Sequence, residues 1–141
     1  MSWLKKKSVL VPLDFSELSY SAIAPAREFV GAETALMLIH VLTPLHPADP
    51  AAMWNTLDDE QRKQKVEEFL AQKLGEMGYQ QVKIKVAIGD PSTEIIDYAK
   101  EISADLIVLP SHGRKGISRF LLGSVTERVV RLSPCPVLVL K

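Results

Sequence analysis

Hydrophobic and polar positions along the chain form a pattern that is typical of buried strands separated by amphipathic helices. Runs rich in Val, Leu and Ile occupy residues 8–13, 35–42, 106–109 and 137–140, whereas residues 82–86 alternate apolar and charged side chains. Between these runs apolar residues recur every three or four positions, which is the spacing of a helix with one buried face. The pattern predicts five strands that alternate with four helices.

The predicted apolar faces of the helices are Leu18, Ala22, Ala26 and Phe29; Val66, Phe69, Leu70, Leu74 and Met77; Ile95, Ala99 and Ile102; and Val125, Val129 and Leu132. Ser16 is the expected N-cap of the first helix, and Pro25 should kink it. Asp90 and Pro91 predict the start of the third helix, and Gly78 the end of the second. The pairs Asp58/Arg62 and Asp59/Lys63 have the i,i+4 spacing of ion pairs on a solvated helix face.

Strands that alternate with helices predict an α/β fold in which a five-stranded parallel sheet carries helices on both faces. The strand order is expected to be Rossmann-like or flavodoxin-like, with the half-polar strand 82–86 at one edge. In both orders ligands bind beyond the carboxyl ends of the strands, where the strand order reverses. The segments to inspect for a site are therefore 12–16, 41–43, 88–90 and 110–124.

Length and composition narrow the class of protein. A chain of 141 residues predicts one domain, residues 1–141. Seventeen basic and seventeen acidic residues cancel, which argues against a dedicated nucleic-acid binder. The single cysteine, Cys135, excludes an internal disulfide and favours a reducing, cytoplasmic location. No apolar stretch reaches the length of a membrane span.

The charge is unevenly distributed, and this makes the loop after the fourth strand the first candidate site. Residues 111–141 hold six basic residues and one acidic residue, together with three of the seven glycines. Gly123-Ser124 stands where the last helix should begin, and the free N–H groups of a helix N-terminus bind anions. Two interpretations stay open on these residues alone: a phosphate site, or a Ser124 cap with glycines that serve turns.

Other familiar sites are missing from the sequence. There is no P-loop motif, no glycine in the loop after the first strand, and no pair of histidines or cysteines at metal-binding spacing. Asp14 stands alone at the end of the first strand. It serves either to shape the start of the following helix or to bind a ligand, and local sequence does not separate the two.

Three segments together resemble the universal stress protein family: the start Val9-Leu-Val-Pro-Leu-Asp-Phe-Ser-Glu17, Gly89-Asp-Pro91, and above all Pro110–Lys141. The resemblance covers nearly the whole chain. It implies the adenine nucleotide alpha hydrolase-like version of the Rossmann-like fold, in one domain. The family has one group that binds ATP through Gly-x2-Gly-x9-Gly-Ser/Thr and another group that lacks this motif and does not bind.

Carried onto this sequence, the motif places Gly113, Gly123 and Ser124 at the phosphates, together with the backbone of Val125 and Thr126. The resemblance also implies that the last strand, Val137–Leu140, pairs with a second copy in a homodimer. The apolar character of that strand, at the expected edge of the sheet, favours the same arrangement.

The resemblance assigns the nucleoside part of the nucleotide to the ends of the first two strands. Asp14 matches the family's strand-1 aspartate, and the backbone of Val41 would meet the adenine edge. The first glycine of the motif is here Pro110, which lacks an N–H and loses one backbone contact. The candidate nucleotide-binding residues are Pro12, Leu13, Asp14, Val41, Gly113, Arg114, Gly116, Gly123, Ser124, Val125 and Thr126.

The leading hypothesis is a dimeric regulatory module that binds ATP or AMP, with or without Mg²⁺, and acts on an unidentified protein client in a stress response. A slow ATPase or other phosphohydrolase is the second hypothesis, although no general base is evident near the expected terminal phosphate. The third is an interaction protein without a nucleotide, in which Pro110 has inactivated the site.

Overall fold

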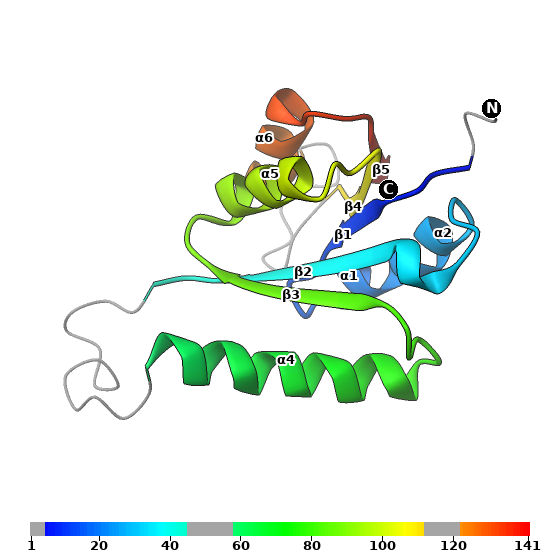
Figure 1. The fold of residues 1–141 in the computed structure, drawn as a ribbon. Helices are drawn as coiled ribbons and strands as arrows, with labels where there is room; N and C mark the ends of the chain where they lie inside the picture. Colours follow the sequence, from blue (N-terminus) through cyan, green and yellow to red (C-terminus); the bar gives the residue numbers. More distant parts are fainter. Residues whose placement is uncertain (1–4, 45–57, 112–121) are drawn as a thin grey trace.

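A computed structural model describes residues 5–44, 58–111 and 122–141, which form one parallel sheet with the strand order β3-β2-β1-β4-β5. The strands are β1 (Val9–Pro12), β2 (Leu36–Leu42), β3 (Lys83–Ile88), β4 (Leu106–Pro110) and β5 (Val137–Leu140) (Figure 1). All five predicted strands are confirmed, and the half-polar strand lies at an edge as expected. The order is Rossmann-like and reverses its direction at β1.

Helices cover both faces of the sheet (Figure 1). One face carries α1 (Glu17–Ser21), α2 (Ile23–Arg27) and α4 (Asp59–Glu76), and the other carries α5 (Pro91–Glu101) and α6 (Ser124–Leu132). A short 3₁₀ helix, η1 (Glu33–Ala35), precedes β2. Among the described helices none is long and apolar enough to cross a membrane.

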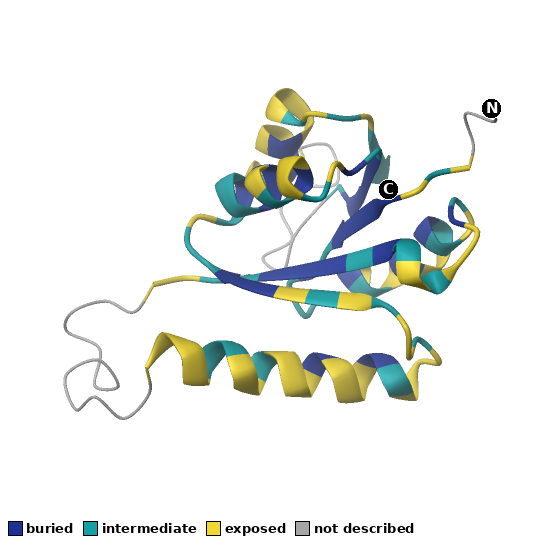
Figure 2. Ribbon diagram, viewed as in Figure 1, coloured by how far each residue is buried: buried dark blue, intermediate teal, exposed yellow. Residues whose placement is uncertain are grey.

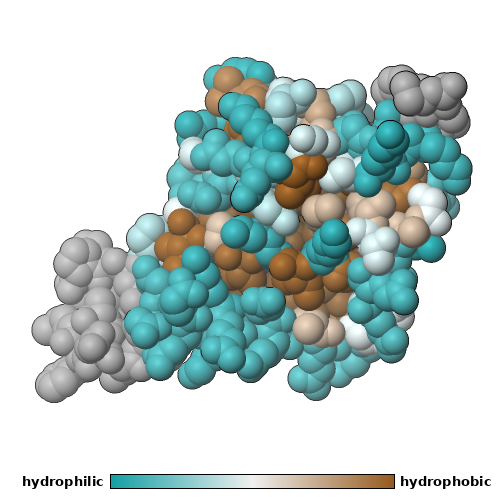
Figure 3. Space-filling view, in the orientation of Figure 1, coloured by the Kyte–Doolittle hydropathy of each residue, from teal (hydrophilic) through white to brown (hydrophobic). Residues whose placement is uncertain are grey.

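The alternation of side chains along the strands divides the core into two layers. In β1, Val9 and Val11 pack toward α2 and α4, whereas Leu10 packs toward α5 and α6. The inner strands are buried along most of their length, and the edge strands are only partly so (Figure 2). Seen from the side of β3, hydrophobic residues gather between the polar outer surfaces of α4 and α5 (Figure 3).

The predicted first helix is divided in two, and Pro25 explains why. A proline at this position has no N–H for the carbonyl of Ser21, so the helix ends there. The chain restarts at Ile23, and Pro25 then stands in a first turn, where a missing N–H leaves nothing unpaired. Ser16 caps α1 as predicted, since its side chain accepts a hydrogen bond from the N–H of Ser19 at 3.1 Å.

The long helix α4 confirms the predicted face only in part. Leu70 and Leu74 are buried, but Phe69 and Met77 are 55% and 39% exposed. Leu132 of α6 is likewise half exposed. The predicted i,i+4 ion pairs are replaced by i,i+3 pairs, Arg62–Asp59 and Lys63–Glu60. For the predicted Asp58/Arg62 pair the reason is that Asp58 is the N-cap of α4 and forms a capping box with Gln61.

The third helix begins as predicted. Asp90 caps α5, and hydrogen bonds from the Thr93 N–H, then from the hydroxyls of Thr93 and Ser92, lower the pKa of this carboxyl. Arg128 of α6 donates to the same carboxylate at 3.2 Å. The ion pair ties the last helix to the loop that follows β3.

The edge strand β5 pairs only with β4 among the described residues. The Ile107 N–H donates to the Pro136 carbonyl at 3.0 Å and the Ser111 N–H to the Leu140 carbonyl at 2.8 Å. Because alternate residues of a strand direct their peptide groups to opposite neighbours, Leu138 also faces β4. The peptide groups of Val137 and Val139 therefore lie at the outer edge of the sheet.

Candidate functional site

A cleft of about 640 Å³ opens where β1, β2 and β4 end. The paired register of β1 and β4 runs only from Val9↔Leu106 to Leu10↔Ile107, so the two strands separate toward their carboxyl ends. This is the point at which the strand order reverses, and it is the place where ligands bind in open α/β sheets. The cleft lies where the sequence predicts a site.

Most of the predicted residues meet in this cleft. Its walls include Pro12, Leu13, Asp14, Val41, Gly123, Ser124, Val125 and Thr126, and also Pro110. Gly113, Arg114 and Gly116 lie outside the described residues. The structure thus brings together strand ends and the start of α6 that are more than a hundred residues apart in the sequence.

Asp14 shapes the loop between β1 and α1. One carboxylate oxygen accepts hydrogen bonds from the N–H of Ser16, at 3.0 Å, and from the Ser16 hydroxyl. The Asp14 N–H donates to the Ser19 hydroxyl at 3.3 Å. Burial and, second, the charge of Asp14 raise the pKa of Tyr20. Asp14 therefore shapes the start of α1, which is one of the two roles that the sequence left open, and it also lines the cleft.

The start of α6 contradicts one of the two interpretations of the sequence, the one in which Ser124 caps the helix. Gly123 is the N-cap, and Ser124 stands at the first helical position. Ser124 therefore does not cap the helix, and it is exposed beside the cleft. The first intrahelical bond runs from the Glu127 N–H to the Gly123 carbonyl at 2.9 Å. The N–H groups of the first helical turn thus have no acceptor within the helix, as at any helix N-terminus.

Two hydrogen bonds join the start of α6 to the end of β4. The Gly123 N–H donates to the Ser111 carbonyl at 2.8 Å, and the Thr126 hydroxyl donates to the Pro110 carbonyl at 2.9 Å. Gly123 and Thr126 are both buried. The Gly123 N–H and the Thr126 hydroxyl thus hold the helix in place, and the N–H groups of Ser124, Val125 and Thr126 have no acceptor within the helix.

The position of Pro110 in β4 shows the direction in which an N–H at residue 110 would point. Ile107 and Ser111 direct their N–H groups toward β5. By the alternation of peptide groups, an N–H at position 110 would point the other way, toward β1 and the cleft. Pro110 therefore leaves the β4–β5 ladder intact and removes a donor only on the cleft side.

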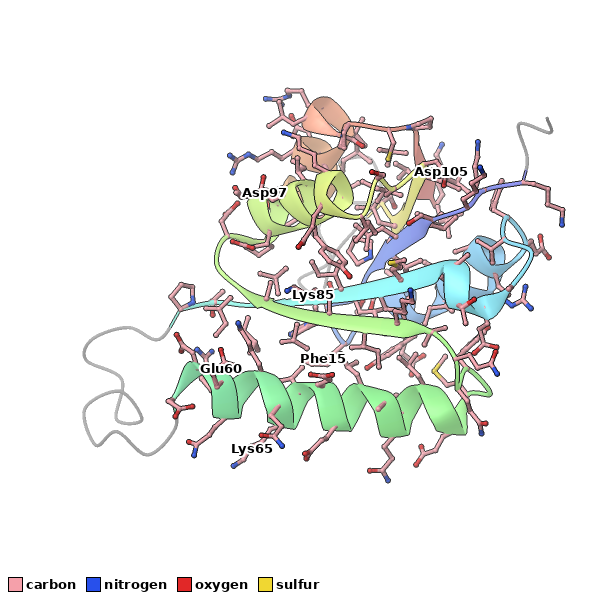
Figure 4. The ribbon with its side chains drawn as sticks, in the orientation of Figure 1. Phe15, Glu60, Lys65, Lys85, Asp97 and Asp105 are labelled. Carbon is pink, nitrogen blue, oxygen red and sulfur yellow. The ribbon has the colours of Figure 1, made fainter. Side chains whose placement is uncertain are left out.

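The residues that line the cleft but were not identified as site residues from the sequence include Phe15, His40 and Arg62. The His40 Nδ1 donates to the Leu13 carbonyl at 2.7 Å, so this ring ties β2 to the end of β1. The Phe15 ring lies 4.1 Å from the His40 ring and meets Phe69 edge-on at 5.6 Å. It lies between the sheet and α4 (Figure 4). A histidine inside an otherwise apolar strand was the available clue to this arrangement.

Phe15 adopts a φ of 67°, in the left-handed region that favours glycine. We expect Phe15→Gly to be more stable than Phe15→Ala by about 0.5–1 kcal/mol. Both variants lose the same ring. Alanine keeps the penalty of roughly 1–2 kcal/mol for a left-handed backbone. Glycine avoids this penalty but loses more conformational entropy on folding, which cancels part of the gain. Urea unfolding of the two variants measures the difference. Equal stabilities, or a more stable alanine variant, would contradict a left-handed backbone here.

Comparison with known proteins identifies the family. The sequence profile of the Universal stress protein family (Usp) matches residues 6–141. The chain belongs to the universal stress protein family. Universal stress protein MJ0531 of Methanocaldococcus jannaschii is 33% identical over an alignment of 141 positions, which covers 96% of this chain and 82% of that protein.

Solved structures of the family have the same fold. Universal stress protein UspA from Lactobacillus plantarum matches with a TM-score of 0.76 at 27% identity, over 97% of this chain and 99% of that one. A universal stress protein family protein from Arabidopsis thaliana with AMP bound matches with a TM-score of 0.60 at 21% identity, over 96% and 91%. The Rossmann-like α/β class predicted from the sequence is confirmed.

Proposed function

We propose that this universal stress protein binds an adenine nucleotide, ATP or AMP, across the ends of β2, β1 and β4. The observation that carries the proposal is the order of these strand ends. Val41 is the last residue but one of β2, Asp14 follows β1, and the start of α6 packs on the end of β4; all three line one cleft. Base, ribose and phosphate follow one another in the same order along a nucleotide.

The phosphate end of the proposed site is the first turn of α6. N–H groups without intrahelical acceptors and the positive end of the helix dipole favour a phosphate. Ser124 adds a hydroxyl at the rim of the cleft. Pro110 removes one donor from this side, so the α6 amides carry more of the binding than in a site with glycine there.

The nucleoside end is formed by the loop after β1 and the end of β2. Asp14 offers carboxylate oxygens, which accept hydrogen bonds from ribose hydroxyls. Apolar side chains of Ile39, Ile95 and Leu109 line the cleft and suit the faces of a purine. The AMP-bound plant structure supports the fold alone at 21% identity, so the ligand assignment rests on this chain's own cleft.

The proposal includes a homodimer formed through β5. This dimer would signal to a protein client whether a nucleotide is bound. The half-buried apolar strand Val137–Leu140 has peptide groups at an open edge, and a two-fold related copy can pair with it. A cytoplasmic location and a role in stress responses belong to the same proposal. The presence of a single cysteine supports the location.

The two alternative functions predict different results with ATP. A phosphohydrolase releases phosphate at rates on the order of 10 per second if it is a typical enzyme, whereas a binding module leaves ATP intact or cleaves it far more slowly. An interaction protein inactivated by Pro110 binds no nucleotide. Mg²⁺ takes most of its ligands from water and phosphates, so each measurement is made with and without the ion.

Asp14→Ala tests the nucleoside end. We expect it to weaken adenosine, AMP and ATP alike, by roughly tenfold, because a hydrogen bond to a charged group is worth about 1.5 kcal/mol or more. Equilibrium dialysis with the three ligands measures the change.

Asp14 also holds the start of α1, so Asp14→Asn is the second variant. It keeps one oxygen for Ser16 but replaces the other with a donor. Asp97→Ala, which removes an exposed carboxylate of α5 outside the cleft, is the control (Figure 4). A loss confined to ATP in the Asp14 variants would place Asp14 at the phosphates and contradict the proposed orientation.

A further inference from the structure

His40 is a buried polar side chain in an otherwise apolar strand, and it bonds to the loop that follows β1. Its Nδ1 donates to the Leu13 carbonyl at 2.7 Å. Because a carbonyl oxygen can only accept, Nδ1 carries the proton at this contact. The centroid of the Phe15 ring lies 4.1 Å from that of the imidazole. The hydrogen bond and the Phe15 ring together hold the imidazole beside the end of β1.

The hydrogen bond from His40 lies where the ladder between β1 and β2 stops. The Leu13 N–H still donates to the Ile39 carbonyl at 2.7 Å, just beyond the last paired residues, Pro12↔Ile39. In a parallel ladder the next bond would run from the Val41 N–H to the Leu13 carbonyl. That carbonyl is bound by the imidazole instead, and within the described part of the chain no backbone bond joins it to Val41.

The peptide group of Val41 consequently faces the cleft. Alternate residues of a strand direct their peptide groups to opposite neighbours. The Leu42 carbonyl accepts the Gly89 N–H at 2.9 Å on the side of β3, so the Val41 peptide group is directed to the side of β1. The ladder with β1 has already ended at this level, and Val41 lines the cleft. Its N–H is therefore open to an acceptor atom on a ligand.

We propose that His40 is a positioning residue for the nucleoside end of the site: by holding the Leu13 carbonyl, it keeps the Val41 N–H available to the bound base. The inference rests on the proposed nucleotide site and assigns to it a side chain that acts through the backbone of its neighbours. Without the imidazole donor, the Leu13 carbonyl is free to accept the Val41 N–H. The ladder then extends by one step and withdraws the donor from the cleft.

Amide hydrogen exchange at Val41, followed by NMR without ligand, tests the proposal. In the wild type this N–H should exchange rapidly and become protected when adenosine binds, since no strand of the described sheet accepts it. His40→Leu removes the donor and keeps an apolar side chain of moderate size. It should slow exchange at Val41 by roughly tenfold, the scale of one hydrogen bond. A variant that merely loosens the fold would speed exchange, so a slower rate is specific to the proposed role.

Two further variants separate positioning from stability. His40→Asn is the rescue variant, because its side-chain amide supplies an N–H donor two bonds from Cβ, as Nδ1 does in histidine. It should restore rapid exchange at Val41. Leu74→Ala is the control, since Leu74 is buried in the core layer against which Phe15 packs but does not line the cleft. It should lower the free energy of unfolding without slowing exchange at Val41.

Calorimetry with adenosine and ATP measures the effect on binding. His40→Leu should weaken both ligands by the same factor of roughly ten, because the hydrogen bond that is lost belongs to the base and not to the phosphates. His40→Asn should recover most of this loss. Leu74→Ala should bind both ligands as the wild type does.

Three results overturn the proposal while the nucleotide site stands. The first is a Val41 amide that is already protected in the wild type without ligand, a measurement that needs no folded variant. The second is exchange in folded His40→Leu that is as fast as in the wild type or faster. The third is an unchanged affinity of that variant for adenosine. A wild type that binds neither adenosine nor ATP overturns the proposed function itself, and this inference with it.

Discussion

Gly123→Val should lower the affinity for ATP by roughly a hundredfold or more while the protein remains folded. Gly123 has φ −62° and ψ 153°, values open to valine, so the backbone is not strained. The new side chain stands at the N-cap of α6 and at the wall of the cleft, where it blocks the approach of a phosphate to the first-turn N–H groups. Two lost hydrogen bonds to a charged group account for the magnitude.

Calorimetry with ATP and adenosine measures this effect. Adenosine has no phosphate and should lose much less affinity than ATP. Gly31→Val is the matched control, because a Cβ at Gly31 meets nothing within 4 Å and Gly31 is not among the residues that line the cleft. An ATP affinity equal to that of the wild type in folded Gly123→Val would place the phosphates elsewhere.

Val139→Pro should separate the proposed homodimer into folded monomers. The Val139 peptide group lies at the open edge of β5, so proline removes a donor that two copies would share. Light scattering at micromolar concentration should then give the mass of one 15.6 kDa chain, whereas the wild type gives twice that mass.

Two neighbouring variants make this test specific. Val139→Ala shortens the same side chain but keeps the N–H, so the dimer should persist. Leu138→Pro removes an N–H that faces β4, so it should lower the stability of each protomer rather than act on the dimer edge alone. A dimer that survives Val139→Pro unchanged, or a monomeric wild type, would contradict the β5 interface.

The sequence was sufficient for the strands, their parallel arrangement and the location of the cleft. Apolar runs and turn residues are local features, and the right-handed crossover rule limits the possible orders. Helix periodicity was less informative about depth of burial. It assigned Phe69, Met77 and Leu132 to apolar faces, but whether such a face is covered depends on where the sheet ends beneath it.

The candidate site was predictable to the extent that motifs mark it. Asp14, Gly123 and Ser124 follow from strand ends and from the glycine spacing, and they do line the cleft. Arg62 could not be found in this way, because its contact with Thr43 spans nineteen residues and joins a helix to a strand end. Phe15 needed its φ of 67°, which no sequence pattern gives for a phenylalanine.

The central claim is that this chain binds an adenine nucleotide in the cleft despite Pro110, and equilibrium dialysis of the purified wild type against ATP tests it most directly. Pro110→Gly is measured beside it, because glycine restores an N–H that points into the cleft. The account predicts saturable binding of one ATP per chain by the wild type, with equal or tighter binding by Pro110→Gly. No binding by the wild type, whatever Pro110→Gly does, would contradict it.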